Sequence, residues 1–205
     1  MSDLDEYTHL PLQIDPQTKT ISAHSSASSR ALEAELEQLN SLHRALLSLD
    51  TPAQIPPPPV PVNPKRSANI TKLRESGNGE YRKGKHAEAV KFYTLGLQMA
   101  LQRPAWEPQG LVREEISALY ANRAQAQMAM QNWPEGAADA EASVEAKRVG
   151  NSKAWWRRGK CLMEMGRLEE AGEWVAKGLE MEGEEAELQA LGQEIKTKLD
   201  AAGAR

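Results

Sequence analysis

The stretch SKAWWRRGKCLMEMGRLEEAGEWVAKGLEME, residues 152–182, decides the fold. Its apolar residues recur at intervals of three and four on both sides of a central break, which predicts two amphipathic helices joined by a tight turn. Segments 70–100 and 117–147 repeat this plan. The breaks between the paired helices fall at Gly84, at Gln131–Asn132 and at Gly166. The sequence therefore predicts three stacked helix–turn–helix units.

Small residues stand at matched places in the three segments. They are Gly77, Ala124 and Gly159 in the first helices, and Ala89, Gly136 and Ala171 in the second helices. A small side chain at such a place lets two helices approach closely. The pattern resembles the tetratricopeptide repeat, a helix–turn–helix unit of about 34 residues whose apolar faces are buried by neighbouring repeats.

The spacing of the repeats and the segment that follows them complete this part. The third repeat begins 35 residues after the second, and the second begins 47 after the first. The extra residues lie around QRPAWEPQG, residues 102–110, whose prolines prevent one continuous helix. Residues 184–202 form an amphipathic capping helix, with Leu188, Leu191, Ile195 and Leu199 on one face. We expect residues 67–205 to form an all-α tetratricopeptide solenoid with this C-terminal cap.

Residues 1–50 have a different character. PLQIDPQTKTISA, residues 11–23, alternates apolar and polar residues around a DPQT turn and predicts a short β-hairpin. Residues 29–49 carry leucines at intervals of three or four, which predicts an amphipathic helix. That leucine stripe either folds back on its own domain or docks on a partner subunit. As the partner-docking surface we select Leu12, Ile14, Leu36, Leu39, Leu42 and Leu46.

Residues 51–66, TPAQIPPPPVPVNPKR, separate the two parts. So many prolines favour an extended polyproline II spacer, and we interpret the segment as a semi-rigid linker. A ligand for a proline-recognising domain is the alternative.

Composition excludes several classes of function. The chain has 25 Lys+Arg against 29 Asp+Glu, which argues against a general nucleic-acid binder. No apolar run approaches the ~20 residues of a membrane span, and the acidic N-terminus does not resemble a secretory signal. The four histidines lack metal-ligand spacing, and the lone Cys161 falls at a helix-packing position. We expect no metal, no cofactor and no enzymatic activity.

Five polar residues recur at places that share a face on the first helices of the repeats. They are Arg74, Asn78, Asn122, Lys153 and Arg157. Three are cations, two are amides, and none is acidic, which suits a ligand with two carboxylates. The C-terminal residue of a chain that ends in Asp is such a ligand. In such a solenoid the first helices of successive repeats line a concave groove, and these five side chains should project into it. Trp155 is assigned to the core, whereas Trp156 lies beside this groove and is a possible peptide contact.

These five positions resemble the carboxylate clamp of co-chaperone tetratricopeptide domains, whose pattern is Lys, Asn, Asn, Lys, Arg. That resemblance implies binding of the C-terminal Glu-Glu-Val-Asp tail of cytosolic heat-shock chaperones. The departure is Arg74, where the family has Lys. Charge is kept but a planar fork replaces a point charge.

The remaining segments sharpen the resemblance. PLQIDPQTKTISA, the Leu-rich helix, the proline linker and MALQRPAWEP, residues 99–108, are together similar to the small cytosolic tetratricopeptide subunit of the fungal post-translational Sec translocon, the seventy-two-type Sec subunit. The resemblance implies a peripheral protein on the cytosolic face of the endoplasmic reticulum, held by a membrane-anchored subunit of the Sec complex. It also implies recruitment of a seventy-kilodalton chaperone. A soluble co-chaperone with the same clamp and no membrane complex is the alternative.

Overall fold

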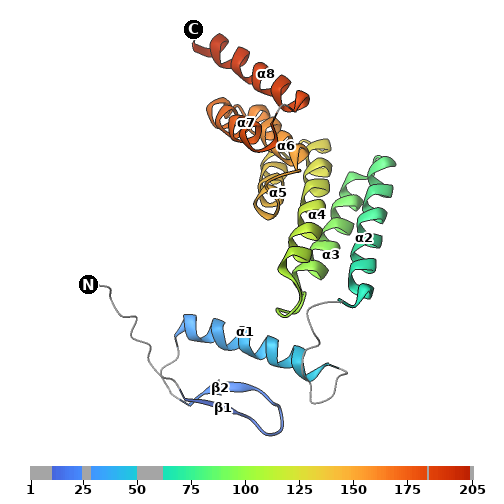
Figure 1. Cartoon of the computed structure of the whole chain (residues 1–205), viewed down its shortest axis with the longest axis vertical. Helices are drawn as coiled ribbons and strands as arrows, with labels where there is room; N and C mark the ends of the chain where they lie inside the picture. The colour runs from blue at the N-terminus through green and yellow to red at the C-terminus, as the bar shows by residue number, and fades with distance from the viewer. Residues whose placement is uncertain (1–10, 25–28, 50–61, 184, 204–205) are drawn as a thin grey trace, which may run out of the picture. The chain divides into compact units, whose positions relative to one another are not determined.

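Two units make up the structure, which is a computed structural model that describes residues 11–24, 29–49, 62–183 and 185–203. One unit comprises Met1–Val60 with Pro104–Trp106, and the other comprises Pro61–Arg103 with Glu107–Arg205. Figure 1 shows the elements of both units, coloured from blue at the N-terminus to red at the C-terminus. Each unit is described by itself.

A hairpin and a helix form the N-terminal unit. Strands β1 (Leu12–Ile14) and β2 (Ile21–Ala23) pair antiparallel, with Ile14 opposite Ile21. The Asp15 carboxylate accepts hydrogen bonds from two backbone amides of the turn, and these bonds lower its pKa. Helix α1 (Arg30–Leu47) begins at Ser29, whose hydroxyl accepts a hydrogen bond from the Leu32 amide. The predicted hairpin and amphipathic helix are therefore confirmed.

Asn40 joins helix α1 to the hairpin. Its side chain is buried, accepts a hydrogen bond from the Ile21 amide at 2.7 Å, and donates one to the Ile21 carbonyl at 2.9 Å. One amide side chain thus satisfies both backbone groups that Ile21 directs away from β1. The other edge of the two-stranded sheet, formed by β1, has no further strand beside it within the described residues.

The predicted docking residues differ in exposure. Leu12 and Ile14 leave 51% and 55% of their surface exposed, and Leu42 is also exposed. The other three predicted docking residues, Leu36, Leu39 and Leu46, are half-buried. The apolar stripe of α1 is therefore only partly covered within the described residues.

The proline-rich segment ends earlier than expected. Residues 50–61 lie outside the described residues, so the linker interpretation of 51–66 is untested there. Its last three residues, however, form the first turn of helix α2 (Pro64–Arg82). Asn63 caps that helix by accepting a hydrogen bond from the Lys65 amide, and Pro64 suits the first helical position because no partner for its missing N–H is needed.

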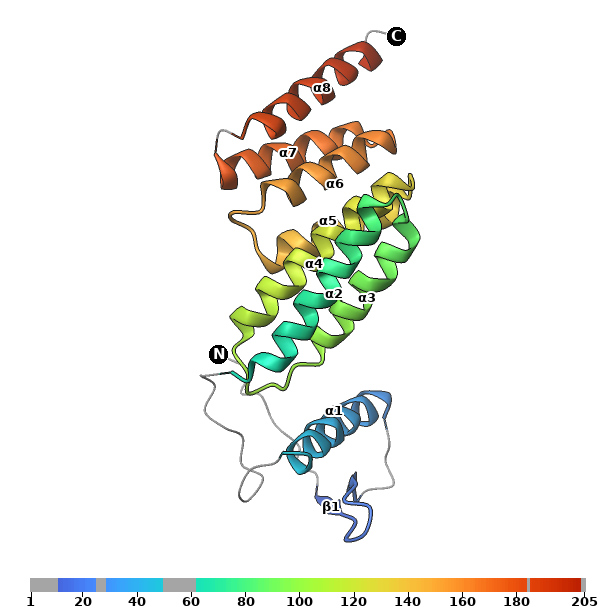
Figure 2. The same cartoon turned by 90° about the vertical axis from the view of Figure 1, so that its right-hand side faces the viewer.

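Helices α2 to α8 build the described part of the larger unit. Figures 1 and 2 show how they follow one another. After α2 come α3 (His86–Leu101), α4 (Gln109–Ala129), α5 (Trp133–Ala146), α6 (Ser152–Glu164), α7 (Leu168–Glu182) and α8 (Ala186–Gly203). Each helix packs on the next, and the first helices α2, α4 and α6 also contact one another in order, with α8 continuing the series. The tetratricopeptide solenoid with three repeats and a cap is confirmed.

The turns inside the repeats occur at the predicted breaks. Gly84 and Gly166 have φ of 76° and 77°, a region that glycine enters without steric penalty. The second repeat uses Gln131 at φ 60° instead. This backbone conformation is uncommon for a residue with a side chain.

Close packing explains the small residues. A Cβ on Gly77 would lie 2.5 Å from Tyr93 Cε1, and one on Gly159 would lie 2.6 Å from Val175 Cγ2. Both distances are too short for real atoms, so each first helix can approach its own second helix only because the side chain is absent. Ala124, at the matched place, is fully buried.

The segment that lengthens the first repeat is fixed by one buried arginine. Arg103 is 7% exposed and donates to Glu115 at 2.6 and 2.8 Å, to Glu107 at 2.5 Å and to the Ser67 hydroxyl at 2.7 Å. These bonds connect the segment after α3 to both α2 and α4. The hydrogen bonds and charges of the two carboxylates raise the pKa of Arg103.

The capping helix uses the predicted face. Leu188, Leu191 and Ile195 are buried, and Leu199 packs against the same core. Gly183, with φ 74°, ends α7 and lets the chain turn into α8.

Candidate functional site

All five predicted clamp residues line a single cavity of about 660 Å³. It lies between the first helices of the repeats, because α2 contributes Arg74 and Asn78, α4 contributes Asn122, and α6 contributes Lys153 and Arg157. We call it the cationic cavity. The cavity thus brings together side chains that are as many as 83 positions apart in the sequence, from 74 to 157. Their role as ligand contacts stays a prediction.

Arg157 is the most buried of the five predicted clamp residues. It is 8% exposed, and its guanidinium donates to the Ala121 carbonyl and to Gln125 Oε1, both at 2.9 Å. No carboxylate of the described residues lies within 4.0 Å of it. Burial therefore lowers the pKa of Arg157. A buried charge without an acidic partner is costly, so the cavity favours an anionic ligand at this point.

Asn78 and Asn122 form a fixed pair. Asn78 Oδ1 accepts hydrogen bonds from the Tyr93 hydroxyl at 2.7 Å and from Asn122 Nδ2 at 3.0 Å. Burial raises the pKa of Tyr93, so its hydroxyl remains protonated and able to donate. Since Oδ1 of Asn78 accepts from both neighbours, its amide nitrogen, which makes no hydrogen bond within the described residues, is the donor that this side chain can offer.

Cations outnumber acidic side chains in the lining of the cationic cavity. Arg74 and Lys153 make no ion pair within the part of the chain that the structure describes, and Arg82 adds a further cation. Glu75 is the one acidic side chain in the lining. Four cations against one carboxylate leave a net charge of +3 on the lining of a chain whose own net charge is −4. The cavity therefore attracts acidic ligands.

A second cavity of about 470 Å³ adjoins the first and contains the predicted peptide contact Trp156. It shares Gln125, Lys153 and Arg157 with the cationic cavity. The remaining lining residues are Tyr81, Met128, Ala129, Trp133, Lys160 and Glu187. We call it the aromatic cavity, since it offers apolar rings beside a cationic boundary.

Trp155, which the sequence assigned to the core, and Arg158, which neighbours Arg157 in sequence, both lie outside the two cavities. Trp155 is buried, and its indole nitrogen donates to the Arg148 carbonyl at 2.9 Å, which confirms it as core. Arg158 pairs with Glu141, and its guanidinium lies 4.3 Å from the ring centre of Trp174. Although it neighbours Arg157 in sequence, Arg158 therefore serves the packing of the third repeat.

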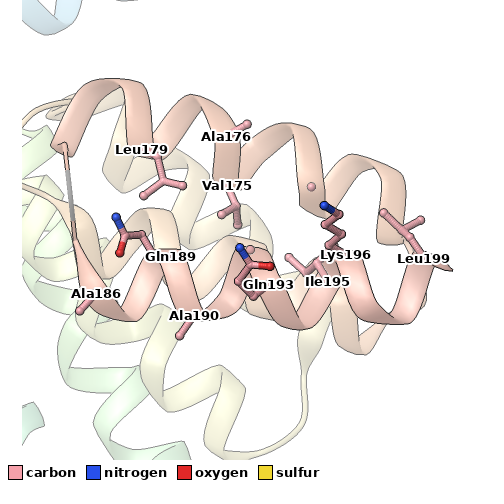
Figure 3. A pocket seen from close by; sticks show the side chains of 12 residues that line it. Val175, Ala176, Leu179, Ala186, Gln189, Ala190, Gln193, Ile195, Lys196 and Leu199 are labelled. Atoms are coloured by element: carbon pink, nitrogen blue, oxygen red, sulfur yellow. The ribbon is translucent and has the colours of Figure 1, made fainter. Parts of the chain in front are cut away.

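A third cavity, of about 650 Å³, lies between α7 and α8 and is mostly apolar. Figure 3 shows Val175 and Leu179 on α7 opposite Gln189, Gln193 and Ile195 on α8. Lys196 is the only charged residue in its lining. This cavity lacks the concentration of cations that distinguishes the groove.

The described residues show no cluster typical of a metal site and one free cysteine, which is buried. Within the described ranges, no three His, Cys, Asp or Glu side chains gather as a metal site. Burial raises the pKa of Cys161 to about 12, so its thiol stays protonated and a poor nucleophile. None of the described helices is long and apolar enough to span a membrane.

Three further residues were not predicted from the sequence: Arg82 and Gln125 line the cationic cavity, and Tyr93 supports Asn78 from behind. Arg82 follows Asn78 by four positions, and Gln125 follows Asn122 by three, so helical spacing alone places them on the same face. Tyr93 was different, because it reaches Asn78 from the second helix of the repeat. The Tyr93 ring can pack this closely against α2 because Gly77 has no Cβ.

Stacked helix–turn–helix pairs of this kind define a tetratricopeptide-repeat protein. No family model matches the chain. A fission yeast protein, the ER protein translocation subcomplex subunit sec67 of Schizosaccharomyces pombe, is 39% identical over 150 residues, covering 72% of this chain and 78% of that protein. The Saccharomyces cerevisiae translocation protein SEC72 is 24% identical over 88% of this chain and 91% of its own length. The chain therefore belongs to the sec67 family, and the predicted resemblance is confirmed.

Solved structures agree in fold. A chain of the Sec complex from S. cerevisiae superposes with a TM-score of 0.75 at 23% identity, over 94% of this chain and 99% of that one. The first tetratricopeptide domain of Spaghetti (RPAP3), bound to the HSP90 peptide SRMEEVD, superposes with a TM-score of 0.55 at 26% identity, over 65% of this chain and 95% of that domain. The first match spans both units, whereas the second covers a length that corresponds to a single repeat domain.

Proposed function

We propose that this chain is a non-enzymatic adaptor of the endoplasmic-reticulum protein translocation machinery that binds the acidic C-terminal tail of a cytosolic seventy-kilodalton heat-shock chaperone. The observation that carries the proposal is Arg157, a buried guanidinium without a carboxylate partner among the described residues, at the boundary of two cavities. A ligand carboxylate would supply the missing charge.

The asparagine pair and the cations fit the same ligand. The terminal residue of a Glu-Glu-Val-Asp tail carries an α-carboxylate and a side-chain carboxylate. Lys153 and Arg157 lie one helical turn apart and can take one of them, while Asn78 and Asn122 offer neutral donors to the other. The HSP90 peptide bound by the RPAP3 domain ends in the same four residues, which supports this class of ligand.

Titration calorimetry tests the tail. For a peptide ending in Glu-Glu-Val-Asp we expect a dissociation constant in the micromolar range, which corresponds to a binding free energy of about −8 kcal/mol. The same peptide without its terminal Asp should bind at least about tenfold more weakly. Tails of the seventy- and ninety-kilodalton chaperones should be compared side by side. Equal affinity with and without the Asp, or an affinity unchanged from roughly 50 to 500 mM salt, would contradict the proposal.

We also propose that the N-terminal unit holds the chain to a membrane-anchored subunit on the cytosolic face of the endoplasmic reticulum. Leu12 and Ile14 are exposed on an open sheet edge, and Leu42 is exposed on α1. Apolar side chains on an unpaired edge favour contact with another protein.

Fractionation tests this second contact. Deleting residues 1–60 should release the protein from membranes and leave tail affinity within about twofold, because distant sites are usually independent. A milder variant, Leu12→Ser with Ile14→Ser, should weaken membrane association, while the matched change Gln13→Ser on the same strand should not. Membrane association that survives the deletion would place the contact on the repeats.

A further inference from the structure

Gln125 stands where the two cavities of the groove meet. It lies on α4, and with Lys153 and Arg157 it is one of three residues that line both the cationic and the aromatic cavity. It is the only neutral residue of the three. A peptide that fills both cavities must therefore pass its side chain.

The contact with Arg157 fixes the orientation of the Gln125 amide. Gln125 Oε1 accepts a hydrogen bond from Arg157 Nη2 at 2.9 Å. The opposite orientation would set an N–H against the guanidinium, donor against donor. The amide nitrogen of Gln125 is thus directed away from Arg157, and it makes no hydrogen bond within the residues that the structure describes. Because the side chain is exposed, both of its N–H groups can reach a ligand.

Gln125 also determines what Arg157 can offer. Arg157 gives one N–H to Gln125 and one to the Ala121 carbonyl, which leaves three of its five N–H donors for other partners. Both acceptors come from α4, so they hold the guanidinium across the groove from α6. An acceptor that is neutral, as an amide is, positions the arginine without neutralising it.

We propose that Gln125 is a sixth ligand-contacting residue of the groove, which positions Arg157 through Oε1 and donates from Nε2 to an oxygen of the bound tail. This inference rests on the proposed tail-binding function. The ligand that fits is an acidic peptide in an extended conformation, with one of its oxygens at the boundary between the cationic and the aromatic cavity. Neutrality at position 125 is then the property that keeps Arg157 available to the ligand.

The decisive variant is Gln125→Glu. It keeps the size of the side chain but places a carboxylate within hydrogen-bond distance of Arg157, where it competes with the ligand and repels it. We expect affinity for a peptide ending in Glu-Glu-Val-Asp to fall by at least about tenfold, whereas Gln125→Ala should lose about three- to tenfold.

Gln127→Glu is the matched control. It adds the same charge two residues away on the same helix, where Gln127 accepts a hydrogen bond from Asn132 and lines neither cavity. Its affinity should stay within about twofold of the unaltered chain. Circular dichroism should show the three variants folded alike.

A peptide with an amidated C-terminus separates a ligand contact from a structural role. If Gln125→Glu acts by charge on the ligand, its penalty should shrink several-fold when the ligand loses one carboxylate. A merely structural defect would lower the affinity for both peptides by the same factor, and that result would overturn the inference. So would equal losses for Gln125→Glu and Gln127→Glu in a chain that binds the unmodified tail. If the unaltered chain fails to bind that tail, the proposed function itself is overturned.

Discussion

Two arginines with nearly the same burial, Arg103 and Arg157, occupy opposite electrostatic situations. Arg103, 7% exposed, is bound by the carboxylates of Glu107 and Glu115. Arg157, 8% exposed, has only a carbonyl and an amide oxygen as partners. The carboxylates raise the pKa of the first, and burial lowers the pKa of the second.

The contrast distinguishes an arginine whose charge the protein itself neutralises from one whose charge it does not. Burial alone does not distinguish the two, although Arg103 makes four side-chain hydrogen bonds and Arg157 makes two. The difference between them is charge, since carboxylates neutralise Arg103, whereas no carboxylate of the described residues neutralises Arg157. A buried cation without a counter-ion lowers stability, so its presence in a groove favours an interpretation as a binding group.

Arg103→Ala should produce the largest change in stability. Its removal leaves two carboxylates close together with no cation, and the expected loss is about 3–5 kcal/mol in the free energy of unfolding. Chemical denaturation measures it. Tail affinity of the variant that remains folded should be unchanged. A loss below about 1 kcal/mol would remove the contrast.

Arg157→Ala should show the reverse behaviour. Stability should change by no more than about 1 kcal/mol, because a costly buried charge leaves together with its two hydrogen bonds. Tail affinity should fall about tenfold to a hundredfold, and Lys153→Ala should match it. Calorimetry with Lys177→Ala, an exposed lysine outside the groove, provides the control, which should bind normally. Equal losses in all three would indicate only diffuse electrostatics.

Smaller effects should come from the neutral donors. Tyr93→Phe frees the Asn78 amide to rotate, and Asn78→Ala removes it, so each should reduce tail affinity by about 1 kcal/mol. Tyr120→Phe is the matched control, because the Tyr120 ring lies beside Arg123 and lines neither cavity. An unchanged affinity for Tyr93→Phe would show that the pair is not held for binding.

Arg74→Lys should have the smallest effect. The charge remains, and only the planar fork is lost, so affinity should stay within about threefold. A larger loss, measured by the same calorimetry, would show that this chain uses the fork of Arg74 for a bidentate contact.

The sequence allowed the fold to be predicted because the signals were redundant. Three segments repeated the same helical spacing, and glycine stood at two of the three turns. The start of the repeat domain was misplaced by three residues, since Pro64 reads as linker but begins α2 under the Asn63 cap. A proline is equally suited to either place, so composition alone could not decide.

The groove was predicted less completely than the fold. Helical spacing located the five clamp residues on one face and would have located Arg82 and Gln125 as well. It could not show that Arg157 is buried without an acidic partner, because that depends on which side chains α4 brings near it. Nor could it place Tyr93 beside Asn78, a contact between the two helices of one repeat.

The charge of the cationic cavity also has a kinetic consequence. A lining of net +3 in a chain of net −4 repels an acidic peptide from most of the surface and draws it toward one place. Such steering brings association rate constants to about 10⁷–10⁸ M⁻¹ s⁻¹, so a micromolar complex would last roughly 10–100 ms. On the proposed function, a tail held for so short a time would be exchanged rather than stored, and the groove would receive a new chaperone many times each second.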